Sequence, residues 1–119
     1  MKQKTSELTG TALDWAVAKC EVPSLAHDNK GHIEHFKHLY NAHVLHQQFH
    51  YSTNWSQAGQ IIEREGICVD LLLNGQWIAA SRKVEGATMY SGPTPLVAAM
   101  RCYVASKLGD EVDIPEELC

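Results

Sequence analysis

Two apolar stretches joined by Asn74 and Gly75 constrain the fold more than any other feature of this sequence. Residues 67–73 (ICVDLLL) and residues 76–82 (QWIAASR) both have the composition of β-strands. Asn-Gly is the dipeptide most typical of a two-residue type I′ turn between antiparallel strands. The sequence therefore predicts a β-hairpin over residues 67–82.

A two-residue turn also predicts the register of this hairpin. It pairs Leu72 with Trp77, and paired residues share one side of the sheet. The two predicted faces carry Val69, Leu71, Ile78 and Ala80 on one side, and Cys68, Asp70, Leu72 and Trp77 on the other. Because both faces are partly apolar, we expect helices on both sides of the hairpin and a largely buried Trp77.

Two helices are predicted before the hairpin from apolar residues at helical spacing. The first covers residues 8–20, with Asp14 expected on its solvated side. The second follows Asn54 as its cap and ends at Gly66, a typical left-handed cap residue. Its expected buried stripe consists of Trp55, Ala58 and Ile62.

A third helix is predicted near the end of the chain. Thr94 is suited to cap it, and Pro95 is suited to the first helical position, where the missing N–H has no helical partner. Gly109 is expected to end it. Its expected buried stripe consists of Leu96, Met100, Tyr103 and Val104.

Length and composition place these elements in one unit. A chain of 119 residues with 45% hydrophobic content is long enough for one core and too short for two. We therefore expect a single domain over residues 1–119 of the α+β class, with a small antiparallel sheet built on the 67–82 hairpin and helices packed on both faces. Residues 110–119 contain five acids and are expected to form a solvated acidic tail.

The charge pattern and the cysteines restrict the partners. The formal net charge is -4, which does not provide the basic surface that duplex nucleic acids require. The polar N-terminus and the lack of an apolar run of ~20 residues predict a cytoplasmic protein that does not enter membranes. The four cysteines form no C-x-x-C pair and are expected as buried or free thiols.

All seven histidines lie within residues 27–50. If residues 32–50 formed one helix, five of them would share a face, namely His32, His35, His43, His46 and His50. Imidazoles spaced by three or four residues can share a zinc or nickel ion. A solvated histidine stripe is the favoured interpretation, because no cysteine or carboxylate completes a closed site. A strand over residues 44–51 is also compatible with the sequence.

Three segments together carry a resemblance to a known family. They are residues 8–17 (LTGTALDWAV), residues 51–65 with YSTNW and IIERE, and residues 92–101 (GPTPLVAAMR). The chain resembles the NinX family of small proteins carried by lambdoid and related tailed phages. Residues 21–50 lie outside the resemblance and are expected to vary within the family. The resemblance implies a phage accessory protein in a bacterial cytoplasm, and it implies no mechanism.

The sequence indicates a binding protein and not an enzyme. It contains no G-x-S-x-G elbow, P-loop, G-x-G-x-x-G or H-E-x-x-H motif, and no cofactor is expected. Helix N–H groups, arginines and aromatic rings would suit a nucleotide-like signalling ligand. The candidate ligand residues are Tyr51, Thr53, Trp55, Trp77, Arg82, Thr94 and Arg101.

Other functions remain open at this point. By analogy with phage proteins that evade host defence, sequestering a nucleotide signal is the favoured function, and inhibiting or modulating a host protein is the alternative. Metal binding by the histidines is a second alternative. We also expect a homo-oligomer, most simply a two-fold dimer, because so few elements would leave an apolar face uncovered.

Overall fold

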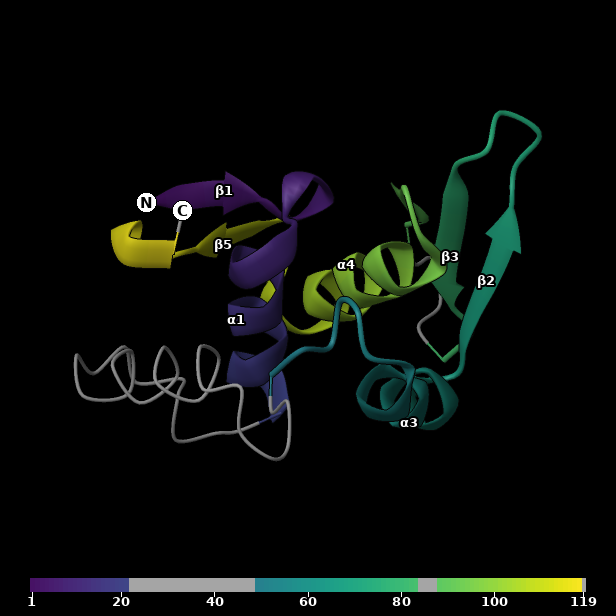
Figure 1. Ribbon diagram of the computed structural model, residues 1–119, viewed down its shortest axis with the longest axis horizontal. Helices are drawn as coiled ribbons and strands as arrows, with labels where there is room; N and C mark the ends of the chain where they lie inside the picture. Colours follow the sequence, from purple (N-terminus) through teal and green to yellow (C-terminus); the bar gives the residue numbers. More distant parts are fainter. Residues whose placement is uncertain (22–48, 84–87, 119) are drawn as a thin grey trace.

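The computed structural model of the chain describes residues 1–21, 49–83 and 88–118 (Figure 1). Helices and two small antiparallel sheets alternate within these ranges, which confirms the predicted α+β class. The elements in chain order are β1 (Lys2–Lys4), the 3-10 turn η1 (Thr5–Glu7), α1 (Gly10–Glu21), α3 (Trp55–Glu65), β2 (Ile67–Leu71), β3 (Trp77–Ser81), β4 (Tyr90–Gly92), α4 (Pro95–Leu108), β5 (Glu111–Asp113) and the 3-10 turn η3 (Glu116–Leu118).

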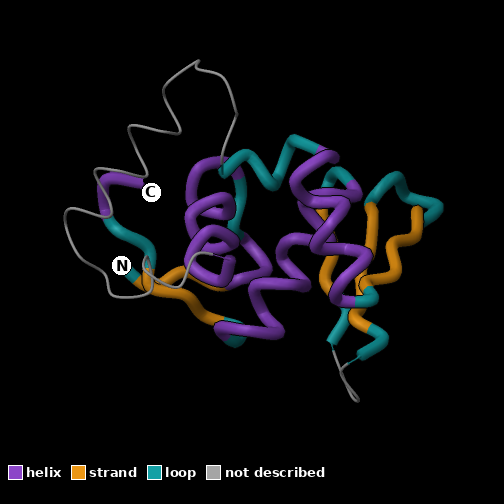
Figure 2. The backbone as a smooth tube through the Cα atoms, turned by 90° about the horizontal axis from the view of Figure 1, so that it is seen from below, coloured by secondary structure: helices purple, strands orange, loops and turns teal. Residues whose placement is uncertain are grey.

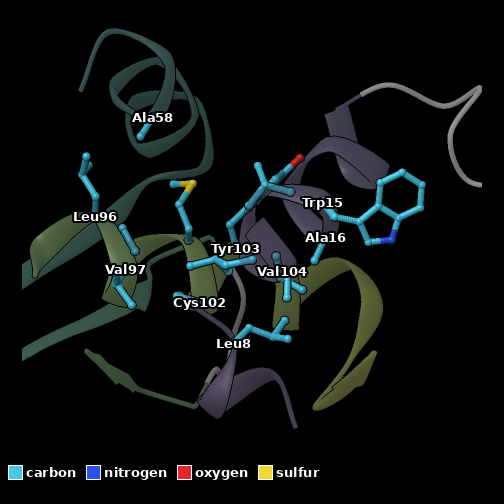
Figure 3. Packing of buried hydrophobic residues seen from close by; sticks show 14 of the residues in the cluster. Leu8, Trp15, Ala16, Ala58, Leu96, Val97, Cys102, Tyr103 and Val104 are labelled. Carbon is cyan, nitrogen blue, oxygen red and sulfur yellow. The ribbon is translucent and has the colours of Figure 1, made fainter. Parts of the chain in front are cut away.

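Helix α4 forms the centre of the molecule. It lies between α1 and the three-stranded sheet (Figure 1), and every residue from Leu96 to Val104 is buried. A helix that is apolar nearly all round needs such cover on several sides. Figure 3 shows side chains from all three described helices in this core, including Trp15 of α1 and Ala58 of α3.

The predicted ends of α4 are confirmed. The Thr94 hydroxyl accepts a hydrogen bond from the Val97 N–H at 3.1 Å, and Pro95 occupies the first turn. Gly109 ends the helix with a φ of +89°, a conformation that favours glycine. Both ends therefore follow from local residue chemistry.

The predicted hairpin exists, but its predicted register is wrong by one residue. The Leu72 N–H donates to the Gln76 carbonyl at 2.8 Å, and the Gly75 N–H donates to the Leu72 carbonyl at 3.0 Å. The loop therefore has three residues, 73–75, with Gly75 at a φ of +87°. A turn followed by a left-handed glycine is the usual three-residue hairpin connection. As a result, Leu71 pairs with Trp77, and Val69 pairs with Ala79.

The shifted register changes which residues share a face, because a slip of one residue moves the partners to opposite sides. One face, called the inner face here, carries Ile67, Val69, Trp77 and Ala79. This face lies against α4. Gly92 of β4 pairs with Trp77 and therefore belongs to the same face, and a Cβ added at Gly92 would lie 2.8 Å from the Ala98 nitrogen of α4. Trp77 is half-buried on this face beside Leu71, and not beside Leu72 as predicted.

The opposite side of the sheet is called the outer face here. It carries Cys68, Asp70, Ile78, Ala80 and Arg82, with Met89 next to the start of β4. Cys68, Asp70, Arg82 and Met89 are exposed, so within the described residues no helix covers this side. The helices pack against the sheet as expected, and the second helical layer is not found in the described part of the chain.

The expected solvated tail is instead part of the fold. Strand β5 pairs with β1, and the register places Lys2 opposite Asp113 and Lys4 opposite Glu111. Figure 2 shows this two-stranded sheet at the opposite end of the molecule from the three-stranded one. The described acids of this segment are exposed, while the alternating apolar residues Val112, Ile114 and Leu118 are buried.

Helices α1 and α3 both depart from prediction in which residues they bury. Asp14 of α1 is 1% exposed and not solvated, and its Oδ1 accepts a hydrogen bond from the Ser52 N–H at 2.7 Å. In α3 the predicted caps Asn54 and Gly66 are confirmed. The expected α3 stripe is wrong in part, because Ile61 is buried with Ala58, while Ile62 is half-buried and Trp55 is exposed.

Candidate functional site

The Arg101 side chain is held inside the protein. It is 8% exposed, its Nε donates to the Leu8 carbonyl at 2.8 Å, and its Nη1 donates to the Ser91 carbonyl at 2.7 Å. Burial lowers the pKa of this guanidinium from its ordinary value. The structure therefore uses the donors of Arg101 to connect α4 with Leu8, two residues before α1, and with β4.

The other candidates near the amino end of α4 are also used locally. Thr94 is an exposed residue, but its hydroxyl accepts a hydrogen bond from the Val97 N–H. Gly92 packs so closely on Val97 and Ala98 that no side chain fits there. The first turn of α4 is therefore closed off by β4 on one side.

The candidates at and just before the start of α3 lie apart from Arg82. Tyr51 is half-buried, and burial together with the Glu21 and Asp14 carboxylates raises its pKa to about 12. Thr53 is exposed, and Trp55 is 58% exposed at the start of α3. Arg82 lies beyond the other end of this 11-residue helix, about 15 Å along its axis at 1.5 Å per residue.

Trp77 and Arg82 project from opposite faces of the sheet. Trp77 is on the inner face, where it packs against the core, and Arg82 is on the outer face. The seven predicted ligand residues therefore lie at several separate places. The structure does not bring them together around one pocket.

The histidine prediction falls mostly outside the described residues. Of the five candidate metal ligands, only His50 is described, and His32, His35, His43 and His46 are not. His50 is half-buried, and its main-chain N–H donates to the Gln57 Oε1 at 2.9 Å. Across residues 1–21, 49–83 and 88–118, no three histidine, cysteine or acidic side chains are grouped to hold a metal ion.

A cluster of charged groups joins the three helices at one end. Arg64 of α3 donates to both carboxylate oxygens of Glu21 at 3.1 and 2.7 Å, and Tyr103 of α4 donates to the same carboxylate. Burial would raise the pKa of Glu21, but the hydrogen bonds from Arg64 and Tyr103 outweigh it and lower the pKa. These groups satisfy one another, so the cluster is a structural clamp.

Three consecutive exposed leucines lie at the end of the hairpin. Leu71 is 53% exposed, Leu72 is 38% exposed and Leu73 is fully exposed. The hairpin extends beyond α4 (Figure 1), so even the inner face is uncovered there. We call residues 71–75 the hairpin tip. This surface was not predicted, because the expected register placed Leu71 and Leu72 on covered faces, although a run of three leucines before Asn-Gly was a visible signal.

The outer face contains a hollow of about 370 Å³. Its lining includes Cys68, Asp70, Ile78, Ala80, Arg82 and Met89. The Arg82 Nε donates to the Cys68 Sγ at 3.3 Å, and Met89 is 62% exposed. Arg82 is the only predicted ligand residue in the lining of this hollow.

Within the described ranges, no helix has the length and apolar character needed to cross a bilayer.

Comparison with known proteins agrees with the sequence resemblance. A search of curated proteins found no match to the chain. Residues 4–107 match the protein family described as "Bacteriophage P22, NinX". The matched range covers most of the 119 residues and includes the three segments that carry the resemblance. The chain therefore belongs to the phage NinX family.

Proposed function

We propose that this phage accessory protein acts in the host cytoplasm as a binding protein, without catalysis, and that it docks onto a host protein through the hairpin tip. The observation that carries this proposal is the exposure of three consecutive leucines where the hairpin extends past α4. Exposed apolar residues gathered at one place mark interaction sites more often than scattered ones. Burial of one leucine side chain in a partner contributes about 1.5–3 kcal/mol.

The geometry favours a protein partner over the nucleotide-like ligand expected from the sequence. A nucleotide would need donors for its phosphate, yet Arg101 is bonded to two main-chain carbonyls and Thr94 caps its own helix. The leucine-rich projecting tip carries no charged donor for a phosphate. It offers the apolar anchors that protein interfaces place at their centre.

A nucleotide-like signalling ligand stays as a second candidate because of one observation. The hollow on the outer face has Arg82 in its lining, and its volume of about 370 Å³ lies within the ~300–1,000 Å³ of small-ligand sites. Such a ligand would meet Arg82 with its phosphate and Ile78 or Met89 with its base. This arrangement uses one of the seven residues expected from the sequence.

Site-specific photocrosslinking in infected cells tests the proposed function. A photoreactive amino acid at position 73 should capture one host protein reproducibly, and the same group at exposed position 63 on α3 should not. Leu73→Ser should then weaken binding of the purified partner at least about tenfold, a loss of ~1.4 kcal/mol. Leu108→Ser removes an exposed leucine at the carboxyl end of α4, away from both the hairpin tip and the outer face, and serves as the control.

Two results would count against a protein partner at the tip. One is that photocrosslinking from position 63 captures the same host proteins as photocrosslinking from position 73. The other is a thermal stability gain with one member of a cyclic-nucleotide panel that disappears in Arg82→Met, because only a bound ligand stabilises the fold by RT ln(1 + [L]/Kd). The second result would favour the nucleotide candidate.

A further inference from the structure

The outer face has the composition of a surface that another layer covers. Ile78 and Ala80 form its half-buried centre, and Met89 projects beside them. The described helices contact this sheet from the inner face and from the start of β2. An antiparallel sheet with one open face usually presents polar residues to water, and this face is apolar at its centre.

The charges on the outer face are arranged at its two ends. Asp70 lies toward the hairpin tip, while Arg82 lies at the other end of the strands, where its N–H bonds to the Gly66 carbonyl. Asp70 lies opposite Ile78 on β3, and Arg82 is four residues further along that strand, about 13 Å away at 3.3 Å per residue. This distance is too long for an ion pair within one chain. Among the described residues, the face therefore offers one acid and one base that do not satisfy each other.

We propose that the outer face is the contact between two copies of this chain, packed face to face about a two-fold axis, with Asp70 of each copy opposite Arg82 of the other. In a two-fold contact, residue i of one copy meets residue j of the other, and the reverse contact follows from symmetry. A face with an acid at one end and a base at the other is complementary to itself under this operation. A partner surface that carried only one sign of charge would be repelled by either Asp70 or Arg82.

The shape of the face is complementary to itself in the same way. Met89 projects at the rim of the hollow, and its flexible, unbranched side chain is suited to filling an irregular gap. The two-fold contact places Met89 of each copy over the hollow of the other. Ile78 and Ala80 then form the centre of a sheet-on-sheet layer.

This dimer goes beyond the proposed function and uses different residues. Leu71 belongs to the inner face and Leu73 to the turn. A dimer contact through the outer face therefore leaves both leucines exposed at the hairpin tip. Loss of the dimer and loss of host-protein binding are therefore separable by mutation.

Charge reversal with complementation tests the proposal. Sedimentation equilibrium at tens of micromolar and low salt should give a dimer for the unmodified chain. Asp70→Arg and Arg82→Glu each replace two attractive pairs by two repulsive ones, and each should raise the dimer dissociation constant about tenfold or more. A mixture of the two variants restores both pairs, so native mass spectrometry should find the heterodimer dominant. Met89→Asp should also dissociate the dimer.

Controls separate dissociation from unfolding. Glu63→Arg makes the same charge reversal on α3 and should stay dimeric. Far-ultraviolet circular dichroism and melting temperature should show that each variant is folded. The proposal is overturned by a monomeric unmodified chain, by dimers that survive both reversals, or by monomeric variants that fail to associate when mixed. A monomer whose hollow binds a nucleotide through Arg82 would also overturn it.

Discussion

Replacement of Arg101 by methionine separates a structural guanidinium from a ligand-binding one. Methionine keeps the apolar stem of this 8% exposed side chain but removes the hydrogen bonds to the Leu8 and Ser91 carbonyls. A hydrogen bond to a charged group contributes about 1.5–3 kcal/mol, so two give about 3–6 kcal/mol. The total stability of a small domain is only about 5–15 kcal/mol. Arg101→Met should therefore lose a large part of the free energy of unfolding.

Urea unfolding followed by tryptophan fluorescence measures this loss. The midpoint should fall by at least the equivalent of about 3 kcal/mol with an unchanged m-value. Gln60→Met is the control, because Gln60 is exposed on α3 and its replacement should change stability by less than about 0.5 kcal/mol. An Arg101→Met variant that unfolds within about 1 kcal/mol of the unmodified chain would refute the structural role.

Three further results are expected. The pKa of Glu21 is lowered from its ordinary value of 4.5, so the hydrogen bonds of the ionised carboxylate stabilise the fold above pH 4.5. This contribution is lost as the pH falls below that value and the carboxylate becomes protonated. Glu21→Gln should therefore flatten the pH dependence of the melting temperature below pH 4.5. Gly92→Ala places a Cβ 2.8 Å from the Ala98 nitrogen and should cost more than about 1 kcal/mol in thermal unfolding, while Gly59→Ala in open space on α3 should gain about 0.5–1 kcal/mol. Trp77→Ala should cost about 2–3 kcal/mol in urea unfolding, below the value for a fully buried tryptophan, and a loss under about 1 kcal/mol would contradict its packing on the core.

Local chemistry made the helix ends and the hairpin predictable. Asn54, Gly66, Thr94 and Gly109 act within a few residues of their own positions, and the structure uses each of them as expected. The register was harder, because Asn-Gly also fits a three-residue loop in which the glycine alone is left-handed. The extra loop residue shifts the pairing, so every residue on β3 has a different cross-strand partner on β2 from the one predicted.

Burial that depends on distant contacts was not predictable from local pattern. Asp14 is buried because the Ser52 N–H, 38 residues later, meets its carboxylate. Arg101 is buried because two carbonyls lie within reach of its fork, one of them 93 residues earlier. The candidate site failed to assemble for the same reason. Residue types suited to a nucleotide were recognised, while their positions in space depend on the packing of α4 against both sheets.

The pairing of β1 with β5 affects the order in which the protein folds during synthesis. Strand β1 leaves the ribosome before all three described helices, and its partner β5 leaves after them. The Gln3–Val112 pair spans more than a hundred residues, so β1 has no strand partner while the helices are being made. A ribosome stalled within α4 would hold a chain whose first strand is unpaired, and that strand would be available to chaperones until Val112 and Ile114 arrive to close the core.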